Sequence, residues 1–320
     1  MASLRPSGPA LPKAILTTRV DPTYDDLPEQ RYHFPRTYLR QIEVAKGDFV
    51  VYYEPRRSTG ELSSRGGRQG YFATARIVDV IPDPTRADHF YAVMDSYLDF
   101  ARAVPFREGR HYYESLLQRD DGATNKGAFG RAVRALPDAE YETICDLGFA
   151  AVLSENRPAV QPPQRIGFSE PPTPFAGFDE PPATFERPIV ERVIARPFRD
   201  AAFSGSIKVA YDDTCAFTGL KIVNGGGRSE VQAAHIRPVA ASGPDSLRNG
   251  LALCGTVHWM FDRGLISIAD NHELLFASGK VRDPVMRMLN ADRRLLTPPR
   301  PDQAPHPMFL RWHRENVFKG

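Results

Sequence analysis

Three polar residues interrupt an apolar stretch in the C-terminal half of the chain. His235 lies near the end of the run "VQAAHI", Asn249 follows fourteen residues later, and His258 follows after nine more. The apolar pattern predicts a strand over 230–236, a loop at Asn249 before Gly250, and a helix that begins near residue 257 and ends at Gly264. A strand, a loop and a helix would therefore each deliver one polar side chain.

These residue types suit hydrolysis of a phosphodiester bond with one metal ion. The reaction needs a general base that activates water and a metal that stabilises the leaving oxygen. A neutral imidazole suits proton transfer near pH 7, so we assign His235 as the base and His258 as a metal ligand. Asn249 would hydrogen-bond the backbone of its loop and orient His235. Asp262, one turn after His258, could bind metal, orient a histidine or pair with Arg263.

The combination also carries a family resemblance. The string "CAFTGL…EVQAAHIRP…SLRNGLALCGTVHWMFDRGLISI" closely resembles the HNH endonucleases, which have a ββα-metal architecture. The resemblance spans about residues 205–280 and holds in order, spacing and apolar pattern. It implies a metal-dependent nuclease whose base, loop anchor and metal ligand fall on His235, Asn249 and His258.

One position departs from the family pattern. Many members carry an aspartate or histidine directly before the base, where it helps to bind the metal, but this chain has Ala234. Mg²⁺ and Mn²⁺ prefer oxygen ligands, so a second protein ligand must come from elsewhere. Asp262 is favoured for its helical spacing, and Asp245 in the loop and Glu230 at the start of the strand are the alternatives.

The cysteines argue against a structural zinc ion. The chain has three, Cys145, Cys215 and Cys254, and the residues three positions after the last two are threonine and valine. A closed zinc site needs four ligands, usually from two close pairs, and three cysteines cannot form a disulfide framework. No apolar run reaches about 18 residues and no signal peptide is evident. We therefore expect a cytoplasmic protein without a membrane span.

Composition along the chain predicts two domains of α+β class. Nine of the 29 prolines fall within 157–188, which indicates a linker between an N-terminal domain at 14–156 and a nuclease domain at 189–320, with a flexible N-terminus at 1–13. From Arg187 onward, 19 lysines and arginines face 13 aspartates and glutamates, whereas the chain as a whole carries only +2. A basic nuclease half is compatible with a phosphate backbone as partner.

The N-terminal half reads as a small β-barrel domain. Strands are expected within 47–55, 70–84 and 89–106, a short helix within 35–44, and a long hairpin loop between the first two strands. The string "YHFPRTYLRQIEVAKGDFVVYYEPRR…GRQGYFATARIVDVIPDP" resembles PUA-like domains of the EVE type. Related SRA and YTH modules bind nucleic acid and enclose a modified base, which is what the resemblance implies here.

Recognition of a flipped base needs aromatic side chains for stacking and polar groups for the base edge. The candidate pocket residues are Tyr32, His33, Phe34, Tyr52, Tyr53, Glu54, Phe72 and Tyr91, with Asp48 as an alternative acceptor to Glu54. Aromatic residues on strands are more often core than pocket. The candidates for contact with the DNA backbone are Arg56, Arg57, Arg65, Arg68, Arg237 and Arg248.

Together these features predict a modification-dependent restriction endonuclease of type IV or type IIM character. The N-terminal domain would flip 5-methyl- or 5-hydroxymethylcytosine out of double-stranded DNA, and the HNH site would cut nearby with Mg²⁺ or Mn²⁺. Cutting both strands favours a homodimer. An HNH nuclease without modification selectivity, and a catalytically inactive nucleic-acid-binding protein, remain as alternatives.

Overall fold

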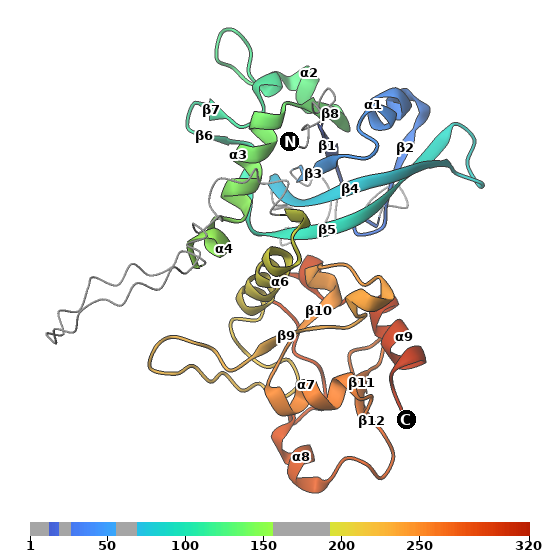
Figure 1. Cartoon of the computed structure of the whole chain (residues 1–320), viewed down its shortest axis with the longest axis vertical. Coiled ribbons are helices and arrows are strands. Elements are labelled where there is room, and N and C mark those ends of the chain that lie inside the picture. The colour runs from blue at the N-terminus through green and yellow to red at the C-terminus, as the bar shows by residue number, and fades with distance from the viewer. Residues whose placement is uncertain (1–12, 19–26, 56–68, 156–192) are drawn as a thin grey trace, which may run out of the picture.

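The computed structural model describes residues 13–18, 27–55, 69–155 and 193–320 (Figure 1). The N-terminal part contains strands β1 (Lys13–Thr17), β2 (Arg31–Pro35), β3 (Phe49–Glu54), β4 (Gly70–Pro82), β5 (His89–Pro105), β6 (Arg107–Glu108), β7 (His111–Tyr112) and β8 (Val133–Leu136). Its helices are α1 (Leu39–Val44), α2 (Lys126–Phe129), α3 (Asp138–Gly148) and α4 (Ala150–Glu155), and 3₁₀ turns span Arg36–Tyr38 and Ser115–Leu117.

Six of these strands form one curled sheet in the order β2-β5-β4-β3-β1-β8. Strand β1 runs parallel to β3, and the other neighbours pair antiparallel. The long strands β4 and β5 shift register at three places along their pairing. Each such bulge increases the local twist, which bends the sheet into the open half-barrel visible in Figure 1.

Both faces of the sheet are buried, and alternate residues of each strand serve opposite faces. Val51 and Tyr53 of β3 pack in a cluster with Tyr141 and Ile144 of α3. Tyr52, between them in sequence, packs on the other face in a cluster that contains Ile42 of α1. The aromatic residues of the strands therefore belong to two separate cores.

The C-terminal part is built around a strand–strand–helix unit. It contains α6 (Arg196–Ala210), β9 (Gln232–His235), β10 (Gly250–Leu253), α7 (Gly255–Asp262), β11 (Ile266–Ile268), β12 (Leu274–Phe276), α8 (Asp283–Met288) and α9 (Pro307–Asn316), with 3₁₀ turns at Val239–Ala241, Leu247–Asn249 and Pro301–Gln303. Strands β9 and β10 pair antiparallel, and α7 follows directly. Gly264 ends the helical segment in the left-handed conformation, with φ of 69°.

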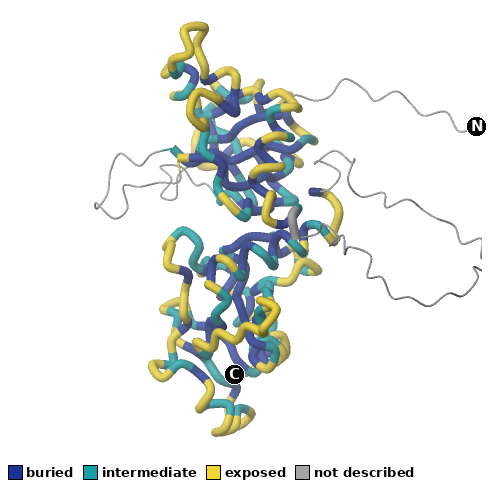
Figure 2. The backbone as a smooth tube through the Cα atoms, turned by 90° about the vertical axis from the view of Figure 1, so that its left-hand side faces the viewer, coloured by how far each residue is buried: buried dark blue, intermediate teal, exposed yellow. Residues whose placement is uncertain are grey.

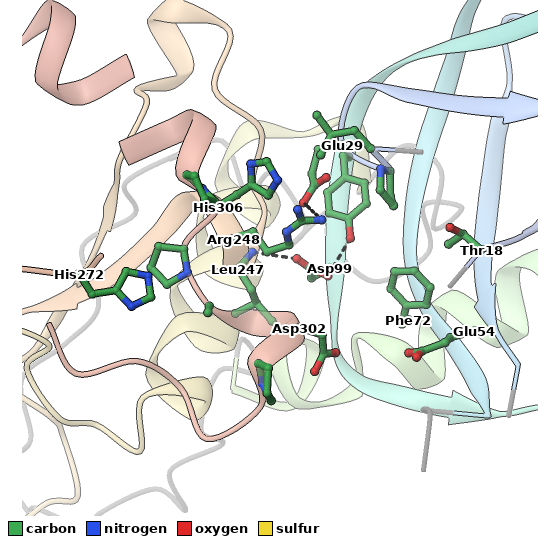
Figure 3. A pocket seen from close by; sticks show the side chains of 17 residues that line it. Thr18, Glu29, Glu54, Phe72, Asp99, Leu247, Arg248, His272, Asp302 and His306 are labelled. Atoms are coloured by element: carbon green, nitrogen blue, oxygen red, sulfur yellow. Dashed lines mark hydrogen bonds and ion pairs between the residues drawn. The ribbon is translucent and has the colours of Figure 1, made fainter. Parts of the chain in front are cut away.

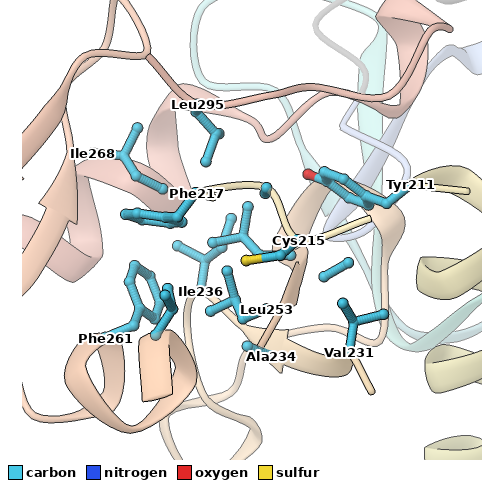
Figure 4. Packing of buried hydrophobic residues seen from close by; sticks show 14 of the residues in the cluster. Tyr211, Cys215, Phe217, Val231, Ala234, Ile236, Leu253, Phe261, Ile268 and Leu295 are labelled. Atoms are coloured by element: carbon cyan, nitrogen blue, oxygen red, sulfur yellow. The ribbon is translucent and has the colours of Figure 1, made fainter. Parts of the chain in front are cut away.

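One apolar cluster holds this unit together. Phe217, Leu253 and Phe261 are buried and bring the chain before β9, strand β10 and helix α7 into contact (Figure 4). The buried backbone, coloured dark blue in Figure 2, runs through the middle of both parts of the chain. Because apolar side chains fill this cluster, His235 and His258 lie at its margins.

The two parts meet where α6 and the loop after β9 lie against β5 (Figure 1). Asp245 forms a parallel β-bridge with Leu98 of β5, and the backbone nitrogen of Leu247 donates a 2.8 Å hydrogen bond to Asp99. The oxygen Oγ of Ser246 donates to Glu29 at 3.0 Å. These polar contacts are buried, so the nuclease part is attached to the sheet through specific groups.

The expected elements are present, with shifted boundaries. The strands within 47–55, 70–84 and 89–106 appear as β3, β4 and β5, the helix within 35–44 is α1, and the strand within 230–236 is β9. The α+β class is confirmed. The expected flexible N-terminus, except for Lys13 at the start of β1, lies outside the described residues, as do most of the hairpin loop and the proline-rich linker. Among the helices described, none is long and apolar enough to cross a membrane.

Candidate active site

His235 is the last residue of β9 and is held by two contacts. Its Nε2 lies 2.9 Å from Oδ1 of Asp245, and its ring stacks on Phe203 of α6 with 3.9 Å between the ring centroids. The side chain keeps 18% of its surface exposed. One face of the imidazole is therefore fixed by packing and one nitrogen by a carboxylate, which leaves Nδ1 as the nitrogen that can accept a proton.

Asn249 fixes the loop that returns to the base. Its side chain is fully buried, and Nδ2 donates to the carbonyl oxygens of Arg237 and Pro244, each at 2.9 Å. Its Oδ1 accepts from the backbone nitrogen of Arg237, also at 2.9 Å. The residue after it, Gly250, pairs with His235 in the sheet. The amide thus connects both ends of the segment between the base and β10.

His258 and Asp262 lie together on one face of α7. Nε2 of His258 is 3.6 Å from Oδ2 of Asp262, and Nδ1 lies 2.8 Å from Oε1 of Gln232 on β9. Because an amide oxygen can only accept, Nδ1 carries the proton and the lone pair of Nε2 faces the carboxylate. Metal-binding histidines are oriented in this way by an outer partner. The donor pair fits a divalent ion that keeps several water ligands.

The other two candidate metal ligands have different partners. Asp245 is buried and uses Oδ1 for His235 and Oδ2 for Arg199, at 2.8 Å from Nε. Glu230 accepts from the backbone nitrogen of Gly255 at 3.0 Å, at the start of α7. Asp245 therefore contacts His235 and Glu230 contacts the start of α7, and a metal-binding role for either residue stays a prediction. In the described part of the chain, no three His, Cys, Asp or Glu side chains gather as a metal site.

The position before the base faces the core. Ala234 is 1% exposed and packs in the apolar cluster of the C-terminal part. Cys215 and Cys254 are also buried there, and a hydrogen bond from the Cys254 thiol lowers the pKa of Cys215. A larger polar residue at 234 would have to displace this packing. The two favoured candidate ligands, His258 and Asp262, both lie on α7.

A groove of about 540 Å³ runs along β9 between α6 and α7. It is lined by His258 and Gln232, and by the basic side chains of Lys208 and Arg228. His235 does not line this groove. It ends the strand that begins with Gln232, three residue steps or about 10 Å away. The groove with His258 therefore lies at the Gln232 end of β9, and His235 lies at the other end of the same strand.

The burial of Asp245 is compensated by charge. Burial alone would raise the pKa of this carboxyl, but the hydrogen bond from His235 and the positive charges of Arg199 and Arg196 outweigh it, and the pKa lies below its ordinary value. Asp245 is therefore a carboxylate at neutral pH. A carboxylate accepts but never donates, so it requires a proton on Nε2 of His235.

The predicted base-pocket residues do not converge on one cavity. Phe34, Tyr52 and Tyr53 are buried in the two cores of the sheet and do not line four cavities of about 320 to 830 Å³ in the described residues. Tyr32 and His33 border one cavity of about 320 Å³, and Tyr91 borders another. The eight residues are thus spread over three cavities and two cores, and the structure does not bring them together in one pocket.

Glu54 and Phe72 lie together in a cavity of about 460 Å³ between the two parts of the chain (Figure 3). The N-terminal part contributes these two residues with Thr18, Glu29, Tyr97 and Asp99. The C-terminal part contributes Leu247, Arg248, His272, Asp302 and His306. Four carboxylates, the rings of Phe72 and Tyr97, and two hydroxyl groups thus border the same space. Sequence patterns missed Asp99, although an aspartate within the apolar run "YLDFA" was a signal.

The arginines expected to contact DNA fall into two groups. Arg56, Arg57, Arg65 and Arg68 lie outside the described residues. Arg248 pairs with Glu29 at 3.5 Å, and Arg237 donates from Nε to the carbonyl of Ala241 at 2.7 Å and lies over the Trp312 ring. Both described arginines therefore have partners within the chain, and their contact with DNA stays a prediction.

Comparisons with known proteins agree with the geometry of the C-terminal part. Residues 215–269 match the HNH_2 family, described as HNH endonuclease. The segment includes His235, Asn249, His258 and Asp262. No curated protein matches the chain.

Two solved structures show partial similarity. The modification-dependent restriction endonuclease TagI is 27% identical over 38% of this chain and 39% of its own, with a TM-score of 0.30. The type IV phosphorothioation-dependent restriction endonuclease ScoMcrA is 12% identical over 77% of this chain and 52% of its own, with a TM-score of 0.18. The chain thus spans about two fifths and half of these proteins. The family match, joined to the strand–strand–helix unit and its histidines, identifies residues 215–269 as an HNH endonuclease domain.

Proposed function

We propose that the chain is a metal-dependent DNA endonuclease that acts on DNA containing modified cytosine. The observation that carries the nuclease assignment is the pairing of His235 with a buried carboxylate beside the Asn249 loop, inside a domain of the HNH family. A histidine that merely filled the core would not need a charged partner. Two basic residues, Lys208 and Arg228, border the adjoining groove and favour a phosphate backbone there.

Each residue has one role in the proposed reaction. His235 takes a proton from the attacking water at Nδ1, since Asp245 keeps the proton of the ring on Nε2. Asn249 holds the loop and so the direction of the imidazole. His258 and Asp262 would hold Mg²⁺ or Mn²⁺, which when bound stabilises negative charge on the leaving oxygen.

The N-terminal part is proposed as the reader of the modified base, in keeping with the PUA-like resemblance of its sequence. The cavity between the two parts offers the Phe72 ring for stacking and the carboxylates of Glu54 and Asp99 as acceptors. The exocyclic amine of cytosine is a donor, and a carboxylate is its natural partner. A flipped 5-methyl- or 5-hydroxymethylcytosine supplies both a flat ring and that amine.

A homodimer is proposed for cutting both strands, because one chain carries one HNH site. Sedimentation velocity of the purified chain, alone and with a modified duplex, tests this part. A single species at the mass of one chain under both conditions, with double-strand cutting intact, would contradict it.

The selectivity is tested by digestion of matched duplexes that carry cytosine, 5-methylcytosine, 5-hydroxymethylcytosine or glucosylated 5-hydroxymethylcytosine, each with Mg²⁺ and with Mn²⁺. The proposal expects cutting of one or more modified duplexes and sparing of the plain one. His235→Ala should bind the modified duplex as well as the wild type does and should not cut it. Binding is measured in the same samples by gel shift.

One observation favours a second function, that of an HNH nuclease without modification selectivity. Most of the aromatic residues expected to form a base pocket are packed in the core of the sheet. Under this alternative the N-terminal part only supports the nuclease. Equal cutting of plain and modified duplexes in the digestion above would favour it.

A further inference from the structure

Asp245 contacts groups from three places in the fold. Oδ1 faces His235 of β9, and Oδ2 accepts from Arg199 of α6, with 2.8 Å to Nε and 2.7 Å to the nearer terminal nitrogen. Its own backbone bridges to Leu98 of β5. The side chain is 2% exposed. With both oxygens engaged, this carboxylate sits between the base of the nuclease and the sheet of the N-terminal part.

Arg199 continues the connection into the sheet. One terminal nitrogen of its guanidinium donates to the carbonyl oxygen of Ser96 at 2.9 Å, and the other donates to that of Tyr97 at 2.8 Å. The residue is 8% exposed. A planar guanidinium with five N–H groups can bind a carboxylate and two carbonyls at once, whereas a lysine ammonium cannot span them.

The two carbonyl groups are available because β5 is irregular at this point. Pairing with β4 shifts between Thr74 and Arg76, so β5 carries one extra residue between Leu98 and Asp95. Ser96 has a φ of 52°, which is the left-handed region and costs free energy for a residue other than glycine. The bulge turns backbone oxygens out of the ladder toward α6. The strain is offset where Arg199 binds them.

We propose that Asp245 is a positioning residue for His235, and that Arg199 makes this positioning depend on contact between the nuclease domain and the bulge of β5. The inference rests on the proposed role of His235 as base. Asp245 sets the tautomer of the imidazole, with the proton on Nε2 and the lone pair on Nδ1. Arg199 holds Asp245 in place only while Ser96 and Tyr97 are within reach. The N-terminal sheet is thereby part of the support of the catalytic base.

The neighbouring contacts point to a consequence for regulation. Tyr97 and Asp99, on the same stretch of β5, border the cavity proposed for the modified base. Asp99 accepts from the backbone of Leu247, two residues after Asp245. A modified cytosine bound in that cavity would therefore contact the strand and the loop that fix the Asp245–Arg199 contact. The residues that recognise the cytosine would thus also influence the position of His235.

The first test uses Asp245→Asn in the full chain. An asparagine amide can donate to Nε2, which would move the ring proton to Nδ1 and remove the lone pair that faces water. The corresponding change in a serine protease lowers kcat by roughly 10⁴ with the geometry intact. We expect kcat on 5-methylcytosine duplex with Mn²⁺ to fall by about 10³ or more while KM changes less than about threefold.

The tautomer itself is read from the ¹⁵N resonances of His235 in protein labelled at histidine, without DNA. The wild type should show the proton on Nε2, and Asp245→Asn should show it on Nδ1. The same tautomer in both proteins would overturn the inference. Because this readout needs no cutting, it decides the inference even if no duplex is cleaved and the proposed function fails.

The second test compares Arg199→Lys with a matched control. Arg314→Lys changes another arginine that binds a carboxylate and a backbone carbonyl, those of Asp270 and Ile268, without contact to Asp245 or β5. We expect Arg199→Lys to lower kcat by about tenfold to a hundredfold and to broaden or shift the His235 resonances, and Arg314→Lys to leave both unchanged. Equal behaviour of the two variants would overturn the coupling to the sheet.

Discussion

Asn249 offers a quantitative test of how the base loop is held. Its side chain is fully buried and makes three hydrogen bonds of 2.9 Å to the backbone of Arg237 and Pro244. Each such bond contributes about 1 kcal/mol net, so Asn249→Ala should lower the free energy of unfolding by about 3 kcal/mol. The backbone groups left without a partner add to this loss, since each is buried.

The assay is urea denaturation at pH 7.5, with the slope m compared between proteins so that a change in midpoint reports stability alone. Asn290→Ala is the matched control, because the Asn290 amide also donates to two carbonyls, of Ala216 at 3.2 Å and of Arg294 at 2.9 Å, and it does not touch the base loop. Both variants should lose stability, but only Asn249→Ala should lose cutting of modified duplex at a temperature where both remain folded. A loss below about 1 kcal/mol for Asn249→Ala, or full activity, would refute the reasoning.

Burial lowers the pKa of His313 to about 4, so the folded chain resists a proton that the unfolded chain accepts near 6.5. The contribution of His313 to the free energy of unfolding is fully present above pH 6.5 and is lost as the pH is lowered. This loss should decrease the free energy of unfolding by about 2 kcal/mol between pH 7.5 and 5.0, and urea denaturation of His313→Gln should show a smaller decrease. Glu54→Gln and Phe72→Ala should each weaken binding of a 5-methylcytosine duplex by about tenfold or more, while binding of the plain duplex is unchanged in gel shifts. Equal weakening for the modified and the plain duplex would contradict binding of the modified cytosine in this cavity. His258→Ala should lose Mn²⁺ binding in calorimetry and Asp262→Asn should weaken it, and unchanged binding in both would place the metal elsewhere.

The local elements could be predicted because their signals are local. The alternation in "GYFATARIV" and the apolar run before His235 correspond to β4 and β9, and Gly264 ends the α7 segment with a positive φ. The order of His235, Asn249 and His258 followed from the same short stretch. Each prediction needed only the periodicity of neighbouring residues.

The partners of the base could not be predicted, because they come from distant parts of the chain. Arg199 lies 46 residues before Asp245, and Ser96 lies 103 residues before Arg199. A carboxylate in a loop after a histidine suggested a metal ligand, and only the position of α6 shows that the carboxylate is already paired. The parallel pairing of β1 with β3 was equally invisible, since it joins segments that are not consecutive.

The alternation of side chains along a strand already argued against one nucleobase pocket formed by all eight candidate residues. Tyr52 and Tyr53 are adjacent on β3 and pack in separate clusters on opposite faces of the sheet. Glu54 and Phe72 meet in the cavity between the two parts, together with Asp99 from β5. A single carboxylate in an apolar strand is costly unless it has a partner, and this is a better signal for a site than aromatic density.

The most direct test of the central claim is digestion of one plasmid in two forms, with cytosine and with 5-methyl- or 5-hydroxymethylcytosine, by the wild-type chain and by His235→Ala in the presence of Mn²⁺. The account predicts that the wild type cuts the modified plasmid and spares the plain one, that chelation of the metal stops cutting, and that His235→Ala binds without cutting. Cutting by His235→Ala at the wild-type rate would contradict the assignment of the base and with it the proposed mechanism.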